Sequence, residues 1–217
     1  MSSHVEENYL KAIYKLTERN KDGAYTNDIA YELNIKPATV TEAIKKLSEK
    51  GLIHYEKYKA VKLTEQGKKI AIKTIRKHRL WEVFLVEKLG FKWDEIHPMA
   101  EELEHIGFEE LTERLAQFLG NPEFDPHGDP IPDRDGNFAK TKSIKLTGVL
   151  LNGTAVMTGV ENHSTSFLQH LDKIGIKLGI SITVKEIVDF DKSMLISVNG
   201  EKEVYLSQEI ASNILCK

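Results

Sequence analysis

Cysteine is almost absent from this 217-residue chain, and Cys216, next to the C-terminus, is its single example. One thiol excludes both a disulfide within the chain and a thiolate cluster for zinc. Long hydrophobic runs are also missing, and none approaches the roughly 20 residues that cross a bilayer. The first residues, MSSHVEENYLKAIYKL, are acidic and then amphipathic, unlike a cleavable secretion signal. We therefore expect a cytoplasmic protein without a membrane partner.

Proline is scarce as well, and four of the six prolines lie between residues 121 and 137. That segment, NPEFDPHGDPIPDRDGN, cannot form regular structure and is either a linker or a ligand-bearing loop. Helical periodicity predominates before it, whereas short strands broken by Gly and Asn follow it, namely SITVKEIV, MLISVNG and KEVYLSQ. The pattern predicts a mainly α-helical protein with a small β-barrel at its C-terminal end.

The N-terminal part has the element order of a winged helix-turn-helix. A helix over residues 4–19 and a second one capped by Thr26 precede a third, which Pro37 opens and Gly51 ends. The following segment, LIHYEKYKAVKLT, has the pattern of a β-hairpin. In such modules one helix enters the major groove and the hairpin touches the flanking DNA backbone.

Two long segments have opposite charge imbalances, the first being poor in acidic residues and the second poor in basic ones. Residues 36–79 carry 13 lysines and arginines against four glutamates, and residues 91–135 carry three basic residues against 13 acidic ones. The first segment suits a polyanion and the second suits cations. The order helix, turn, helix and hairpin favours DNA binding over a merely solvated basic face. The expected DNA contacts are Lys36, Pro37, Ala38, Thr39, Thr41, Lys45, Lys46, Tyr58 and Lys59.

Histidine and glutamate recur at helical spacing in the acidic segment. Helices are expected over residues 64–89 and 94–106, the second with Asp94 as its cap. His78 and Glu82 are four residues apart on the first of these helices. The second helix places further side chains on one face, namely His97, Glu101, Glu104 and His105.

Six nitrogen and oxygen donors on two antiparallel helices would suit a divalent transition-metal ion. Their spacing is not the H-E-x-x-H pattern of zinc proteases. A solvated acidic face with ordinary hydrogen-bonded histidines is the alternative. In the proline-rich segment, Asp125 and His127 would either close a second site with Glu82 or be polar residues of a linker.

Three motifs, KHRLWEVFL, HPMAEELEH and DPHGDPIP, follow a beginning that includes ENYLKAIYKL. Together they resemble the metal-dependent repressors of the diphtheria toxin repressor and manganese transport regulator family, over essentially the whole chain. The resemblance implies a homodimer that binds Mn(II) or Fe(II) and then a palindromic operator, usually to repress metal-uptake genes. The implied domains are a winged helix-turn-helix (1–63), a helical metal-binding and dimerisation domain with a linker (64–137) and an SH3-like FeoA-type domain (138–217).

The resemblance also implies a set of metal ligands without sulfur. The main group is Asn8, His78, Glu101, Glu104 and His105. The ancillary ligands are Glu82 and His97, and the proline-rich loop adds the pair Asp125 and His127. One more ligand is expected near Glu161, Asn162 or His163. Asn8 stands where the family usually has Asp or Met, and Asp125 where streptococcal-type members have Cys. Lys11 replaces a second acid of the manganese regulators, which argues against their close two-ion cluster.

Metal choice follows from the donor atoms. Glu101 and Asn8 stand where iron-responsive members carry Cys and Met, and hard oxygen donors favour Mn(II), with Fe(II) as the alternative. We expect the ion to tie the first helix to the acidic helices and thereby to fix two recognition helices at the half-site spacing of an operator.

The apolar stripe with Trp81, Phe84 and Leu85, together with helices over residues 94–106 and 108–119, is predicted to form the dimer contact. A core role within one protomer is the alternative for these side chains. Three other functions compete with metal-dependent regulation. A winged-helix regulator of a small organic ligand needs no metal, a metalloenzyme needs a catalytic motif that we do not find, and the basic segment argues against a metal buffer. We therefore expect no enzymatic activity.

Overall fold

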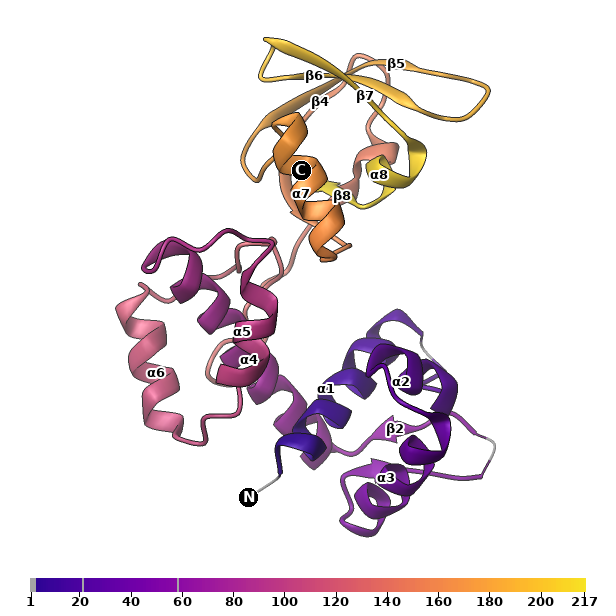
Figure 1. Cartoon of the computed structure of the whole chain (residues 1–217), viewed down its shortest axis with the longest axis vertical. Coiled ribbons are helices and arrows are strands. Elements are labelled where there is room, and N and C mark those ends of the chain that lie inside the picture. Colours follow the sequence, from indigo (N-terminus) through magenta and orange to yellow (C-terminus); the bar gives the residue numbers. More distant parts are fainter. Residues whose placement is uncertain (1–2, 21, 58) are drawn as a thin grey trace. The chain divides into compact units, whose positions relative to one another are not determined.

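The computed structural model describes residues 3–20, 22–57 and 59–217 (Figure 1). The chain forms two compact units, each assembled from three segments. The first comprises Met1–His78, Glu101–Glu113 and Pro132–Asn137, and the second comprises Arg79–Ala100, Arg114–Ile131 and Phe138–Lys217. In the described part of the chain, none of the helices has the length and apolar character needed to cross a membrane.

The first unit begins with the predicted winged helix-turn-helix. Its elements are α1 (His4–Arg19), α2 (Thr26–Glu32), α3 (Pro37–Glu49), β1 (Ile53–His54) and β2 (Lys62–Leu63). Ser3 and Glu6 form a capping box at the start of α1, and Pro37 lies in the first turn of α3, where a missing N–H costs little. Strands β1 and β2 pair antiparallel as a hairpin. Thr26 is the first residue of α2 and not its cap, so this detail of the prediction is wrong.

One hydrophobic cluster holds the winged helix-turn-helix together. Leu10 and Ile13 of α1, Ile29 of α2 and Ile44 of α3 are fully buried in it. Gly67 brings the next helix close to the hairpin, because a Cβ at this position would lie 2.0 Å from the carbonyl oxygen of Leu52. The recognition helix is therefore fixed by its apolar face, which leaves its polar face exposed.

The middle of the chain contains the three predicted helices. They are α4 (Glu65–Glu87), α5 (Ile96–Leu103) and α6 (Glu109–Phe118). Helix α5 is shorter than expected, since it begins two residues after Asp94 and ends before Glu104. Asp94 does not cap it, and its carboxylate instead accepts a hydrogen bond from Gln169 Nε2 at 2.8 Å.

Trp81 and Phe84 pack against the core of the second unit. Their rings meet edge to face with centroids 5.6 Å apart. They lie on a buried cluster made of Leu80, Val83, Leu115, Ala116 and Ile131. Leu85 is buried as well. These side chains thus have a core role within one protomer, and their part in a dimer contact stays a prediction.

The C-terminal part of the second unit is a six-stranded antiparallel sheet with two helices. Its elements are β3 (Ile144–Lys145), η1 (Leu146–Gly148), β4 (Thr154–Val160), α7 (Thr165–Ile174), β5 (Ser181–Ile187), β6 (Met194–Val198), β7 (Lys202–Leu206), α8 (Gln208–Ser212) and β8 (Ile214–Cys216). The strand order is β3-β8-β4-β5-β6-β7. Among the residues described, β3 and β7 are edges, so the sheet is open and not the closed barrel that the sequence predicted.

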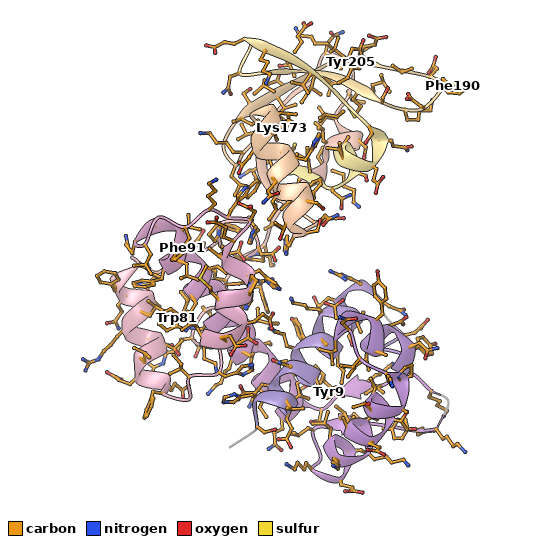
Figure 2. The ribbon with its side chains drawn as sticks, viewed as in Figure 1. Tyr9, Trp81, Phe91, Lys173, Phe190 and Tyr205 are labelled. Atoms are coloured by element: carbon orange, nitrogen blue, oxygen red, sulfur yellow. The ribbon has the colours of Figure 1, made fainter. Side chains whose placement is uncertain are left out.

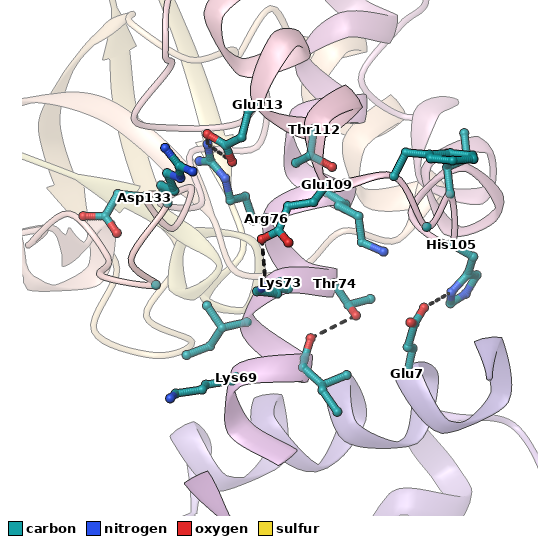
Figure 3. Close-up of a pocket in the computed structure, with 18 of the residues that line it drawn as sticks. Glu7, Lys69, Lys73, Thr74, Arg76, His105, Glu109, Thr112, Glu113 and Asp133 are labelled. Atoms are coloured by element: carbon teal, nitrogen blue, oxygen red, sulfur yellow. Dashed lines mark hydrogen bonds and ion pairs between the residues drawn. The ribbon is translucent and has the colours of Figure 1, made fainter. Parts of the chain in front are cut away.

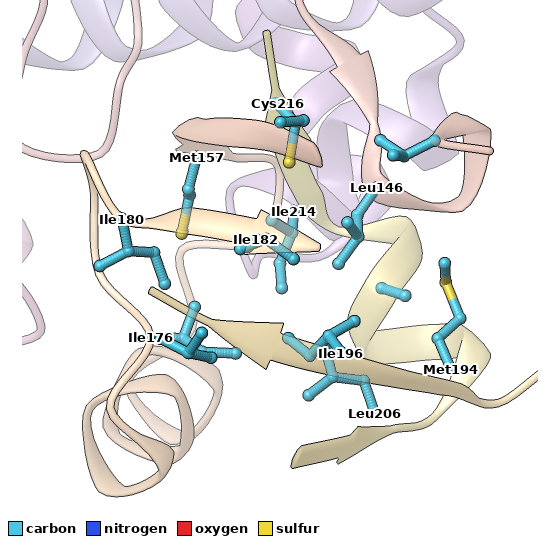
Figure 4. Packing of buried hydrophobic residues seen from close by; sticks show 14 of the residues in the cluster. Leu146, Met157, Ile176, Ile180, Ile182, Met194, Ile196, Leu206, Ile214 and Cys216 are labelled. Atoms are coloured by element: carbon cyan, nitrogen blue, oxygen red, sulfur yellow. The ribbon is translucent and has the colours of Figure 1, made fainter. Parts of the chain in front are cut away.

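The core of this sheet is filled by aliphatic side chains, together with two methionines and Cys216 (Figure 4). Ile182 and Ile196 face Met157 and Cys216 in it, and Ile176 packs beside them from the segment after α7. Phe190, in the turn between β5 and β6, points into solvent (Figure 2).

Candidate metal centre and DNA-binding surface

The main group of expected metal ligands lies within the first unit. Helix α1 carries Asn8 and helix α4 carries His78. Glu101 lies in the last turn of α5, whereas Glu104 and His105 occupy the turn that follows this helix. The five residues come from three separate parts of the sequence, and packing brings His78 of α4 within 4 Å of Glu101 and Glu104.

Glu104 is the most buried member of this group, with no exposed surface. Its Oε2 accepts a hydrogen bond from His78 Nδ1 at 2.6 Å, and its Oε1 lies 2.6 Å from Lys11 Nζ. Glu101 Oε1 accepts from the same ammonium at 2.8 Å. The buried carboxylate of Glu104 requires positive charge beside it, because burial of an uncompensated anion is costly, whereas the side chain of Glu101 is 32% exposed.

His105 has one ring nitrogen held by a carboxylate. Its Nδ1 lies 2.7 Å from Glu7 Oε2, a pair visible in Figure 3, and its ring stacks on that of His4. When Nδ1 donates its hydrogen bond to Glu7, a neutral ring has its lone pair on Nε2, as in many metal-binding histidines. Sequence patterns carry no signal for Glu7, because it is 98 residues from His105.

Two buried atoms of this group make no hydrogen bond to any described residue: Asn8 Oδ1 and His105 Nε2. Buried polar atoms in native proteins are nearly always satisfied, so two such atoms among the expected ligands point to a ligand-binding site. A divalent ion would satisfy both, because a carboxamide oxygen and an imidazole nitrogen are ordinary donors. The residues present therefore fit a divalent ion with oxygen and nitrogen ligands.

A second group of possible ligands lies entirely within the second unit. Glu82, Asp125 and His127 are buried, and one ligand atom from each lies within 4.8 Å of the others. His127 Nε2 donates to the carbonyl oxygen of Trp93 at 2.8 Å, which leaves Nδ1 facing Glu82 Oε2 at 3.7 Å. His97 Nδ1 lies 3.4 Å from the other oxygen of Glu82. The proline-rich segment thus folds back onto Glu82.

The acid–base properties of this second group follow from its burial. Burial raises the pKa of Asp125 to about 7, and the charges of Glu82 and Asp129 act in the same direction. Burial alone lowers the pKa of His127, but its contact with Glu82 and the charge of Asp125 outweigh this and raise it to about 9. His127 thus carries a proton beside Glu82, which a metal ion would have to replace.

Asp125 also has a structural role. Its Oδ1 accepts hydrogen bonds from the backbone N–H groups of His127 and Asp129 at 2.8 and 3.0 Å, which fixes the turn. The guanidinium of Arg79 lies 3.6 Å from the other oxygen, Oδ2. Asp125 is therefore shared between the loop and the candidate site, unlike the carboxylates of the main group.

Of the three further candidates near residue 162, His163 lies beside the second group. Its ring stacks on that of His127 with centroids 4.8 Å apart. Glu161 instead pairs with Lys145 at 2.7 Å, and Asn162 Oδ1 accepts from the backbone N–H of Ser164 at 2.9 Å. The structure thus favours His163 over its neighbours as an additional ligand.

The expected DNA contacts lie mostly on exposed surface of the first unit. On α3 the buried side chains are Val40, Ile44 and Leu47, so the residues between them face outward. Exposed or half-exposed on this helix and before it are Lys36, Pro37, Ala38, Thr39, Thr41, Lys45 and Lys46. In the hairpin Lys59 is exposed and pairs with Glu56, and Tyr58 lies outside the described residues.

A cavity of about 740 Å³ lies in the first unit, beside α4 (Figure 3). Ile70 and Phe108 supply apolar wall, and the pairs Lys73–Glu109 and Arg76–Glu113 border it. Glu7 and His105 also line it, so the cavity adjoins the main metal group. Its volume would admit a small organic molecule.

Three family models match consecutive parts of the chain. The models for the iron-dependent repressor N-terminal DNA-binding domain and for its metal-binding and dimerisation domain match residues 1–61 and 64–133. The model of the FeoA domain matches residues 144–217. The order of the three matches agrees with that of the domains implied by the motifs.

Individual relatives are similar over nearly the whole length. The iron-dependent repressor IdeR of Mycobacterium leprae is 30% identical over 216 residues, which cover 94% of this chain and 93% of the relative. The diphtheria toxin repressor of Corynebacterium diphtheriae is 29% identical over 96% of this chain and 94% of its own. A solved manganese-dependent transcriptional repressor in complex with manganese has a TM-score of 0.87 and 32% identity, over 97% of this chain and 98% of that one.

Proposed function

This chain belongs to the iron-dependent repressor family, and from that premise we propose that it is a metal-dependent transcriptional repressor. It binds a palindromic operator as a homodimer when a divalent ion occupies the main group, and it represses genes of metal uptake. Operator binding places its work in the cytoplasm, where the chromosome is. The motifs that carry the resemblance in the sequence are therefore interpreted correctly.

The observation that carries this proposal is the pair of unsatisfied buried atoms Asn8 Oδ1 and His105 Nε2, the second of which lies 3.8 Å from Glu104 Oε1. Ordinary structural polar clusters satisfy their members internally. A cluster that leaves two ligand-type atoms unsatisfied and joins two carboxylates is suited to bind a cation. The second group, which contains Asp125 and His127, is proposed as an ancillary site.

Each residue of the main group has a separate role. Asn8, His78, Glu101, Glu104 and His105 would hold the ion, and a bound ion would supply two positive charges to the carboxylates of Glu101 and Glu104. Glu7 holds the Nδ1 proton of His105, which keeps Nε2 available as a ligand. Asn8 comes from α1, so its participation ties the winged helix-turn-helix to the segment that carries Glu101 and Glu104.

We propose Mn(II) as the ion, with Fe(II) as the alternative. The main group offers three oxygen-donor residues and two histidines without sulfur, a donor set that does not select for a soft ion. Relatives with each dependence exist: one is described as an iron-dependent repressor and another as a manganese-dependent repressor in complex with manganese.

Operator binding in the presence of single metals tests the proposal. A mobility-shift titration under anaerobic conditions, with Mn(II), Fe(II) and Zn(II) added one at a time, should give retarded DNA with Mn(II) or Fe(II) and none in excess chelator. Undiminished binding in excess chelator would contradict metal dependence.

Sensing of a small organic ligand is the second candidate function, and the 740 Å³ cavity beside α4 is the observation that favours it. A regulator of this kind would bind DNA without metal and would show no response to chelator. The same mobility shift therefore separates the two functions, and calorimetry would show whether the protein takes up any metal.

A further inference from the structure

Lys11 is a buried cation at the centre of the main metal group. Its side chain is 7% exposed, and its ammonium donates to Glu101 Oε1 at 2.8 Å and to Glu104 Oε1 and Oε2 at 2.6 and 2.8 Å. Lys11 follows Asn8 by three residues on α1, so the two side chains share a face of that helix. The oxygens that Lys11 contacts are the oxygens that a divalent ion would use.

We propose that the Lys11 ammonium competes with the divalent ion for the carboxylates of Glu101 and Glu104, so that metal binding requires this lysine to be displaced. The inference rests on the proposed function, because it concerns the same site. Bonds from carboxylate oxygen to a first-row ion such as zinc are roughly 2.0–2.2 Å long. An ammonium within hydrogen-bond distance of both carboxylates fills the space in which such bonds would form.

Electrostatics makes joint occupancy unfavourable. Two cations that share the carboxylates of Glu101 and Glu104 repel each other, because the buried surroundings of Glu104 and Lys11 screen charge poorly. Lysine is suited to withdrawal, since its compact charge sits on a flexible four-carbon stem. The ammonium also joins α1 to the segment 101–104 through the oxygens that the ion would use. Lys11 therefore weakens metal binding and raises the ion concentration at which the regulator responds.

Removal of the charge tests this competition. Lys11→Met removes the charge and keeps an unbranched side chain that is one atom shorter, and calorimetric titration should show Mn(II) binding at least tenfold tighter than in the wild-type protein. In excess chelator the same variant should unfold at a lower temperature than wild type, because the buried carboxylate of Glu104 loses a charged partner. Lys11→Gln, a second uncharged variant, should also bind Mn(II) more tightly and covers the case in which the methionine variant does not fold.

Lys50→Met is the matched control. Lys50 also pairs with a glutamate of α1, Glu6, but this pair lies outside the metal group. Its Mn(II) affinity should stay within twofold of wild type. If both Lys11 variants bind Mn(II) as wild type does, or more weakly, the proposal is overturned, because the ion pair is then structural and does not compete.

Displacement has a readout of its own. Lys11 should resist amine acylation in excess chelator and become reactive in saturating Mn(II), as followed by peptide mass spectrometry, while the exposed Lys50 reacts in both conditions. A Lys11 that stays protected in saturating Mn(II) would overturn displacement. Failure of the proposed function looks different: wild type and Lys11→Met would then both leave Mn(II), Fe(II) and Zn(II) unbound, which overturns both proposals at once.

Discussion

Glu102 and Glu104 are two positions apart, yet Glu102 is exposed and Glu104 is fully buried. Helical spacing distinguishes these two glutamates in the sequence. Positions 97, 101, 104 and 105 share one face of a helix, and position 102 lies on another face. The structure shows why spacing alone was insufficient: Glu104 lies just beyond the end of α5, and its burial comes from contacts with His78 and Lys11.

A first prediction follows for these acids. Glu101→Ala and His105→Ala should each weaken Mn(II) binding at least about a hundredfold, because each removes a direct ligand of the proposed site. Asp125→Ala should cost less than about tenfold, since Asp125 belongs to the ancillary group. Calorimetric titration measures all three, with the exposed Glu102→Ala as the control. Equal losses at Glu101 and Asp125 would show that the two groups are ranked wrongly.

The residues that contact the expected metal ligands were much harder to predict from the sequence than the metal ligands themselves. Glu7 and Lys11 contact residues 98 and 93 positions away. Sequence spacing reports which side chains share one helix face, but it carries no information about which helix packs opposite. Lys11 was notable in the sequence only as a departure from an acidic position, and its role depends on tertiary packing.

Cys216 gives a second prediction at the scale of a residue. Its side chain is buried in the core of the sheet, and burial raises the pKa of the thiol to about 11. The thiolate is the reactive form, so at pH 8 only about one thiol in a thousand would be ionised. Iodoacetamide should therefore leave Cys216 unmodified in the native protein and alkylate it in guanidinium chloride, as measured by mass spectrometry. Complete alkylation of native protein within minutes would contradict this burial.

At the scale of elements, the proline-rich loop depends on one glycine. Gly128 has φ +88°, and a Cβ there would lie 2.0 Å from the carbonyl oxygen of Thr158 on β4. The loop that carries Asp125 and His127 therefore packs directly on the sheet, and the backbone N–H of Val160 also donates to the carbonyl oxygen of His127 at 3.0 Å. No side chain fits at position 128 without moving the loop.

Gly128→Ala should consequently destabilise the protein more than the same substitution at a matched glycine does. Gly179→Ala is the control, because Gly179 has φ +84° but no heavy atom within 4 Å of the place that a Cβ would take. The control should lose about 1–2 kcal/mol from backbone strain, and Gly128→Ala should lose a further ~1–3 kcal/mol from overlap with the sheet. Urea unfolding of both variants measures the difference, and equal midpoints would contradict the close packing.

Elements made of local contacts were the predictable ones. Helices α1, α3 and α4 carry apolar periodicity, capping residues and a first-turn proline, all of which act within a few residues. The C-terminal sheet was predicted only through β5, β6 and β7, which are joined by short turns. Helices α7 and α8 were missed, and strand β3 pairs with β8, about 70 residues later, for which the sequence has no local signal.

At the scale of the whole molecule, the compact units do not follow the order of the sequence. The first unit ends within α4 at His78 and resumes at Glu101. The three domains expected at 1–63, 64–137 and 138–217 remain a proposal, which the three matching family models support. The boundary after His78 falls inside the continuous helix α4, where the sequence has neither a linker nor a change in composition. The sequence alone could therefore not reveal it.

The dimer is the last property at this scale, and its predicted contact has an exposed apolar part. Phe118, at the end of α6, is 66% exposed, and its ring lies 6.4 Å from that of Phe84. Leu89 and Phe91 of the same unit are exposed as well. Apolar side chains that continue a buried cluster outward are typical of protein–protein contacts. Together with the metal-binding and dimerisation model that matches residues 64–133, this favours a second copy of the chain as the partner.

Phe118→Asp should therefore shift the protein from dimer to monomer, because a carboxylate in an apolar contact loses its hydration without gaining a partner. Sedimentation velocity at a few micromolar protein measures the change. Phe190→Asp is the matched control: Phe190 is 97% exposed, in the turn between β5 and β6, and its replacement should leave the dimer intact. If Phe118→Asp sediments as a dimer like the control, the contact lies elsewhere, and the metal then has to order the two recognition helices through another face of the molecule.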